Sequence, residues 1–156
     1  GRVVEPPLFE EMVGHVDGLI ATFSAAHDLA HVLDGRSAHL LGTSGTVTTI
    51  AGIHLGLPAY DRRKVDGCWV DAAEVRKVSQ RLLAMKHEER VAEPCIGRDR
   101  ADLVLAGCAI LESLMRAWPC ERLRVADRGL REGILASLMA EDPIYRRRRH
   151  RPGRGD

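Results

Sequence analysis

The chain has 156 residues and a formal net charge of +1, a size that fits one domain or part of one. Hydrophobic residues make up 45% and charged residues 29%, which argues against a disordered chain. No apolar run approaches the roughly 20 residues of a membrane span, and no signal-peptide pattern is visible. The first residue is Gly1 rather than Met, as expected for a processed chain or for a fragment of a longer protein.

Basic residues gather at the carboxyl end of the chain. Residues 146–156 hold six of the 23 basic residues and one of the 22 acidic ones, so the part before them carries a net charge of −4. A nucleic-acid-binding domain usually has a basic body, so the tail alone carries any such signal. We predict a disordered Arg-rich tail at residues 144–156, with RNA or phosphate contact as the alternative.

A long helix is predicted first, because apolar residues from Phe9 to Phe23 recur at helical spacing. The pattern continues weakly to Leu33, and Gly35 is a plausible stop. The apolar run 38–41 follows and predicts a buried strand. A Gly/Ser/Thr turn and a short helix over 47–56 come directly after it.

The rest of the chain is predicted to be mostly helical. Residues 58–70 are expected to form an irregular connection, and Asp71 with Glu74 has the spacing of a capping box before the next helix. The strongest helical pattern covers roughly residues 99–117. A second strand over 122–126 and a final helix complete an α/β, helix-rich class with about two parallel strands.

The turn after the first strand carries the clearest chemical signal. It runs Gly42-Thr43-Ser44-Gly45-Thr46 between a strand and a helix. Glycines let backbone N–H groups approach an anion, and the helix dipole adds attraction. Neither a Walker motif nor a dinucleotide fingerprint is present, since no Lys follows the glycine and the G-x-G-x-x-G pattern is absent. A tight turn with a Ser or Thr cap explains the same pattern without a ligand.

Two other chemistries fit parts of the sequence less well. The same turn is close to the G-x-S-x-G nucleophile elbow, but Thr46 replaces the last glycine and no later histidine suits a triad. His27 and His31 stand four apart on a predicted helix, as in a two-histidine metal site, with Asp34 or His39 as conceivable third ligands. Two solvent-facing histidines are the simpler interpretation, and we predict no metal ligand in this chain.

A second polar turn is expected beside the first. Residues 127–133 follow the second predicted strand and include Asp127 and Arg131. Ligands in open α/β sheets bind beyond the carboxyl ends of strands, where both turns would meet. Arg100, at the start of the strong helical pattern, either binds phosphate or pairs with nearby acids.

These segments, taken in order, resemble the Ppx/GppA (exopolyphosphatase / guanosine pentaphosphate phosphohydrolase) family. The resemblance covers most of residues 8–140 and rests on residues 42–49, 100–111 and 125–135. It implies a partial RNase H-like domain of the actin-like, sugar-kinase-like ATPase superfamily. Residues 1–143 would be the second domain of such an enzyme, in which a missing N-terminal domain supplies the general base and two phosphate loops.

The resemblance also implies an activity. Such enzymes hydrolyse the terminal phosphate of inorganic polyphosphate or of guanosine pentaphosphate, with Mg²⁺ assisting attack by water. This chain would form one wall of the cleft and be inactive alone. The residues expected to contact phosphate or nucleotide are Gly42, Thr43, Ser44, Gly45, Thr46, Arg100, Asp127 and Arg131.

The resemblance leaves an open strand edge at Leu40 and Leu41, which a second copy or the missing chain is predicted to cover. Four cysteines without a C-x-x-C pair are expected to be reduced, as in a cytoplasmic protein. A non-catalytic regulatory or interaction module of the same fold is the alternative function. The sequence does not choose between polyphosphate and the guanosine nucleotide, although the Arg-rich tail suits a long polyanion better.

Overall fold

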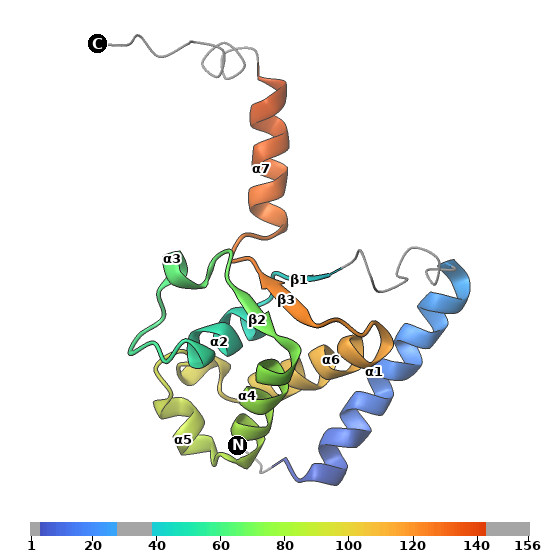
Figure 1. Cartoon of the computed structure of the whole chain (residues 1–156), viewed down its shortest axis with the longest axis vertical. Helices are drawn as coiled ribbons and strands as arrows, with labels where there is room; N and C mark the ends of the chain where they lie inside the picture. Colours follow the sequence, from blue (N-terminus) through green and yellow to red (C-terminus); the bar gives the residue numbers. More distant parts are fainter. Residues whose placement is uncertain (1–3, 28–38, 143–156) are drawn as a thin grey trace.

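The computed structural model describes residues 4–27 and 39–142 (Figure 1). The elements, in chain order, are α1 (Pro6–His27), β1 (Leu40–Gly42), α2 (Gly45–His54), α3 (Arg62–Val65), β2 (Trp69–Asp71), α4 (Ala72–Ala84), α5 (His87–Ala92), the 3₁₀ helix η1 (Arg98–Arg100), α6 (Val104–Ala117), β3 (Arg122–Val125) and α7 (Leu130–Glu141). None of the helices in these ranges is long and apolar enough to cross a membrane. The predicted Arg-rich tail and His31 lie outside the described residues.

A three-stranded sheet lies at the centre, in the order β1-β3-β2. β1 runs parallel to β3, with Leu40 opposite Leu123 and Gly42 opposite Val125. β2 runs antiparallel to β3. The predicted parallel pair is therefore confirmed, and the sheet is mixed because of a third strand that we did not predict.

β2 was missed because it is too short to show a pattern. It has three residues, of which Val70 alone is buried, and its last residue is also the N-cap of α4. Its pairing with β3 is reinforced from the side: the guanidinium groups of Arg122 and Arg124 each lie 5.1 Å from the centre of the Trp69 ring. The segment 58–70, expected to be irregular, in fact holds α3 and most of β2.

Three other local predictions need correction. The strong helix begins at Val104 rather than near residue 99, because residues 98–100 form a 3₁₀ turn. Asp71 is the N-cap of α4, but its side chain makes no capping hydrogen bond. The strand predicted to be buried is an edge strand, and Leu41 is 59% exposed.

The helices pack on the sheet and on one another around an aliphatic core. α1 lies along α6, α2 and α4 pack together, and α4 also contacts α6. The largest fully buried side chains come from all these elements and include Val13, Ile50, Leu82, Leu105, Met115 and Leu123. Two polar contacts also join α1 to α6: Ser113 donates a hydrogen bond to Asp17, and Arg116 pairs with Glu10 at 3.0 Å.

One close approach decides how α6 meets α2. A Cβ atom at Gly107 would stand 1.9 Å from Thr46 Oγ1 and 2.8 Å from Thr46 Cβ. A change of rotamer moves the hydroxyl but not Cβ, so the second contact cannot be relieved without moving the backbone. Gly107 therefore lets α6 pack against the first turn of α2, next to the predicted phosphate turn.

α7 stands apart from the rest of the molecule (Figure 1). It has no buried residue, and four large apolar side chains are exposed on it: Leu130, Ile134, Leu135 and Leu138. The outer edge of β1 has no strand partner within the described residues. That a second copy or a further segment of chain covers this edge stays a prediction.

Replacing Gly107 by Ala should destabilise the fold by about 1–3 kcal/mol, because the added methyl group overpacks the α2–α6 contact. Gly14→Ala is the matched control, since a Cβ atom there meets nothing within 4 Å and the exchange should stabilise α1 by about 0.5–1 kcal/mol. Urea unfolding of the two variants measures both effects.

The Thr46→Gly exchange tests the cause. It should recover most of the loss when combined with Gly107→Ala, because it removes the atoms that the new methyl group meets. Additive losses in the double variant would mean that the clash with Thr46 is not the reason.

Candidate functional site

The Gly42–Thr46 turn lies where β1 ends and α2 begins. Ser44 is the N-cap of α2, and its Oγ accepts a hydrogen bond of 3.3 Å from the Val47 amide. The hydroxyl proton of Ser44 remains available to a ligand, since Oγ is the acceptor in this contact. The amides of Gly45 and Thr46 precede the first intrahelical hydrogen bond, which Thr48 donates to the Ser44 carbonyl. The turn is thus both a capped helix start and a group of exposed donors.

The two glycines of the turn are required for different reasons. A Cβ atom at Gly42 would lie 2.6 Å from a methyl carbon of Val47, so α2 could not fold back over the strand end. A Cβ atom at Gly45 would lie 3.4 Å from Arg100 Nη1. The Arg100 guanidinium therefore rests against the backbone of Gly45, as expected for a cation that shares an anion site with the turn.

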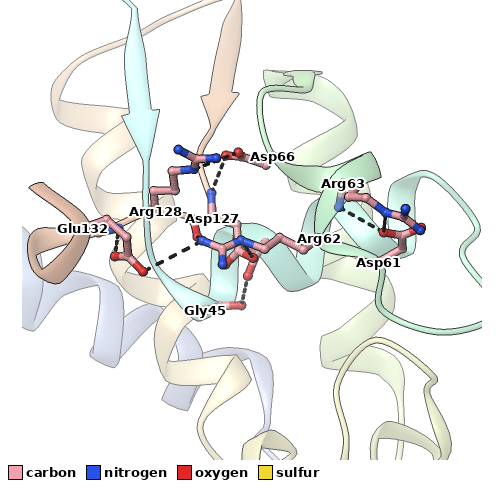
Figure 2. Close-up of polar contacts among 10 residues, drawn as sticks. Gly45, Asp61, Arg62, Arg63, Asp66, Asp127, Arg128 and Glu132 are labelled. Atoms are coloured by element: carbon pink, nitrogen blue, oxygen red, sulfur yellow. Dashed lines mark hydrogen bonds and ion pairs between the residues drawn. The ribbon is translucent and has the colours of Figure 1, made fainter. Parts of the chain in front are cut away.

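The parallel pairing brings the second turn to the same edge. The ladder continues past the strands, because the Ala126 amide donates to the Gly42 carbonyl at 2.9 Å. Asp127 follows directly and is half-buried. Its amide donates to Asp66 Oδ1 at 2.9 Å, which fixes the chain as it leaves the sheet (Figure 2).

Arg62 is one of two residues of this site that the sequence analysis missed. It reaches from α3 to Asp127, with Nε 3.1 Å from Oδ2 and Nη2 donating to the Asp127 carbonyl. Nη2 also lies 3.9 Å from a Glu132 oxygen (Figure 2). No local pattern pointed to Arg62, because it stands in the segment expected to be irregular and meets its partner 65 residues later.

Tyr60 was missed for the same reason. Its hydroxyl lies beside Thr48 and the Asp127 carboxylate, and Arg100 is close enough to act on it electrostatically. Burial raises the pKa of the Tyr60 phenol above its ordinary value, with the hydrogen bond to Asp127 acting in the same direction. The phenol is therefore neutral near neutral pH and lies beside Asp127.

The base of α7 is held by polar contacts. Glu132 accepts a hydrogen bond of 2.9 Å from the Gly129 amide, and this contact lowers the pKa of its carboxyl group. Arg128 lies 3.6 Å from Asp66 (Figure 2). Arg131, which we predicted to contact phosphate, is exposed on the first turn of α7, where its charge also lowers the pKa of Glu132.

The residues described do not fit a magnesium site. They contain no group of three His, Cys, Asp or Glu side chains that could hold a metal ion. The acidic groups of the site, Asp66, Asp127 and Glu132, each face an arginine instead. At each of these carboxylates an arginine takes the place that a cation would need. These residues are therefore not suited to hold Mg²⁺.

Nucleophilic serine chemistry is not supported either. His54 lies at the far end of α2, about 15 Å from Ser44 along the helix axis, and its Nδ1 lies 3.5 Å from Glu74. His27 is exposed on α1 with its ring 4.5 Å from that of Phe23. All four cysteines are free thiols, and burial raises the pKa of Cys108 to about 11. These groups are structural or solvent-facing.

A cavity of about 600 Å³ lies elsewhere, between the start of α1, α4 and α6. Phe9 and Leu83 form apolar parts of its wall. Several of its charged groups pair with one another, since Arg116 lies 3.0 Å from Glu10 and 2.9 Å from Glu112. No residue of the two turns lines it.

Comparison with known proteins identifies the family. The model of the Ppx/GppA phosphatase family matches residues 4–142. The chain belongs to this family. Exopolyphosphatase 2 of Mycobacterium tuberculosis is 29% identical over 102 residues, which cover 63% of this chain and 32% of that protein. The chain therefore spans about a third of the length of this relative.

Solved structures agree on the fold. The Ppx/GppA family member of Aquifex aeolicus matches 89% of this chain and 42% of its own, with a TM-score of 0.73 and 24% identity. An exopolyphosphatase from Cytophaga hutchinsonii matches 88% of this chain and 43% of its own, with the same TM-score and 19% identity. The helix-rich, actin-like Ppx/GppA fold implied by the sequence is confirmed.

The contact between Glu132 and Gly129 predicts a titration. A lowered folded pKa means that the stabilising contact is complete above the ordinary glutamate range and is lost as the pH falls through the folded value. NMR should find the Glu132 carboxyl titrating below an ordinary glutamate, with the Gly129 amide shift following it. The Glu132→Gln variant should remove that pH dependence, whereas an ordinary pKa for Glu132 would contradict the contact.

Proposed function

We propose that this chain is the second domain of a phosphatase that hydrolyses the terminal phosphoanhydride of inorganic polyphosphate or guanosine pentaphosphate. Residues 1–143 would form the domain, followed by the Arg-rich residues 144–156. The observation that carries the proposal is the position of the Arg100 guanidinium beside Gly45, where a Cβ atom would lie 3.4 Å from Nη1, at an edge that also holds Asp127. Family membership supports the class of reaction.

In this proposal, the chain binds and orients phosphate. The amides of Gly45 and Thr46 and the Ser44 hydroxyl donate to phosphate oxygens, and Arg100 neutralises charge from the other side of Gly45. Among the described residues, Arg100 has no carboxylate within ion-pair distance, whereas Arg62 is already paired with Asp127. Arg100 is therefore the cation that can accept phosphate without first giving up an acidic partner.

The remaining parts of the reaction are proposed to lie outside this chain. A general base and magnesium ligands would come from the missing N-terminal domain, because the acids at this edge face arginines. The 156-residue chain alone would then be inactive. Its place of action would be the cytoplasm, in keeping with its free thiols.

One observation favours the second candidate, a non-catalytic module with the same fold. The described residues lack any metal-holding cluster, and the acidic groups of the site are all engaged. A regulatory protein that binds a phosphate compound without cleaving it needs no more than the turn and Arg100. Measured turnover separates the two candidates.

The test is phosphate release from polyphosphate and from guanosine pentaphosphate with Mg²⁺, comparing residues 1–156 with the full-length gene product. We expect turnover by the full-length protein alone, and the faster substrate names the specificity. Binding without turnover in both would favour the regulatory module. Turnover by residues 1–156 alone would contradict our assignment of the base to another domain.

The role of Arg100 is tested separately in the full-length enzyme. Arg100→Ala should lower kcat/KM by roughly 10- to 100-fold, as expected for the loss of a charge-assisted hydrogen bond. Arg98→Ala is the matched control, because Arg98 is exposed on the same 3₁₀ turn and no contact places it at Gly45. Equal effects of the two substitutions would mean that the turn contributes general positive charge rather than a specific contact.

A further inference from the structure

The six-residue helix α5 contains a buried charge. Arg90 is 3% exposed, and no carboxylate of the described residues lies within ion-pair distance of it. Its guanidinium bonds to two backbone carbonyls instead. Nη1 donates to Met85 at 2.6 Å and Nε donates to Ala101 at 3.1 Å.

A buried guanidinium is an expensive way to fill this space. Removing a charge from water without a counter-ion costs free energy, which carbonyl hydrogen bonds recover in part. Met or Leu would fill a similar volume without that cost. What Arg90 adds is direction, since its planar group holds donors at fixed angles and joins two backbone segments that differ by 16 positions in the sequence.

The segment that Arg90 holds is the one that presents Arg100. Ala101 follows η1 directly, and its carbonyl is the acceptor for Arg90. The next residue also lies beside α5, since His87 Nδ1 is 3.1 Å from Asp102 Oδ1, although no hydrogen bond joins them. Arg100 stands between Ala101 and Gly97, whose φ of +75° sets the direction of the turn.

We propose that Arg90 is a positioning residue for phosphate binding. It fixes the backbone at Ala101 so that the Arg100 guanidinium stays against Gly45 and meets a terminal phosphate without rearrangement. Arg90 is buried and touches no substrate itself. The inference rests on the proposed function, in which Arg100 contacts phosphate.

A double-mutant cycle in the full-length protein tests this. Arg90→Met and Arg90→Lys are each made with Arg100 present and with Arg100→Ala, and KM and the Kd for polyphosphate are measured. With Arg100 present, Arg90→Met should raise both constants at least fivefold, and Arg90→Lys less. In the Arg100→Ala background, either exchange should change them by less than twofold.

The thermal midpoint provides the readout for a merely structural role. Loss of the Arg90 contacts should lower Tm equally in both backgrounds, while the effect on binding depends on Arg100. Val13→Ala, in the buried part of α1, is the stability control and should lower Tm with KM unchanged within twofold. Arg90→Lys keeps the charge and serves as the test if Arg90→Met does not fold.

Two results would overturn the inference and are distinguishable. In the first, Arg100→Ala lowers affinity, but the Arg90 variants change KM and Kd by the same factor in both backgrounds. Arg90 then supports the fold and does not position Arg100. If Arg100→Ala leaves affinity unchanged, the proposed phosphate contact fails, and the role of Arg90 fails with it.

Discussion

The parallel pairing of β1 with β3 is the constraint on which the site depends. These strands are about 80 residues apart in the chain, and their register places Gly42 opposite Val125. One further hydrogen bond, from the Ala126 amide to the Gly42 carbonyl, brings the two turns together at one edge. A shift of one residue in this register would turn Leu123 away from the core and separate Asp127 from the first turn. The buried Leu123 and Val125 therefore fix the site as well as the sheet.

The sequence predicted the parts of this arrangement that repeat or carry a local signal. The long helices, the parallel strand pair and the Gly42–Thr46 turn all show in the spacing of residues. β2 could not be predicted, because three residues with one buried side chain show no periodicity. The 3₁₀ turn before α6 could not be predicted either, since the residue after it accepts a hydrogen bond from Arg90, eleven residues earlier.

The site itself was predicted incompletely for a related reason. Gly42, Ser44 and Gly45 could be recognised from a local motif, and Arg100 from its helix start together with the family resemblance. Arg62 and Tyr60 reach the site from a segment without regular pattern, so their part in it depends on tertiary contacts alone. Arg131 was expected at the site as part of the turn over 127–133; it lies exposed on the first turn of α7, and its contact with phosphate stays a prediction.

The charges at the edge divide into two groups with different consequences. The first group forms ion pairs that fix the chain between β3 and α7, and consists of Arg62, Arg128, Asp66, Asp127 and Glu132. Arg100 lies outside that network, against the backbone of Gly45. An anion bound at the turn can therefore gain the attraction of Arg100 while the ion pairs that hold the path into α7 remain intact. In the proposed function, the charge that binds phosphate is thus separate from the charges that hold the base of α7.

The same network explains how α7 is held where it stands. An isolated helix of twelve residues is marginal in water, and this one buries none of its apolar side chains. Two sets of contacts hold its first turn. Glu132 accepts a hydrogen bond from the Gly129 amide, and Arg62 forms ion pairs with Asp127 and Glu132. Polar contacts at one end set the direction of a helix, but they do not remove Leu130, Ile134, Leu135 and Leu138 from water. These four side chains therefore remain exposed on α7, whose first residue follows the turn that holds Asp127.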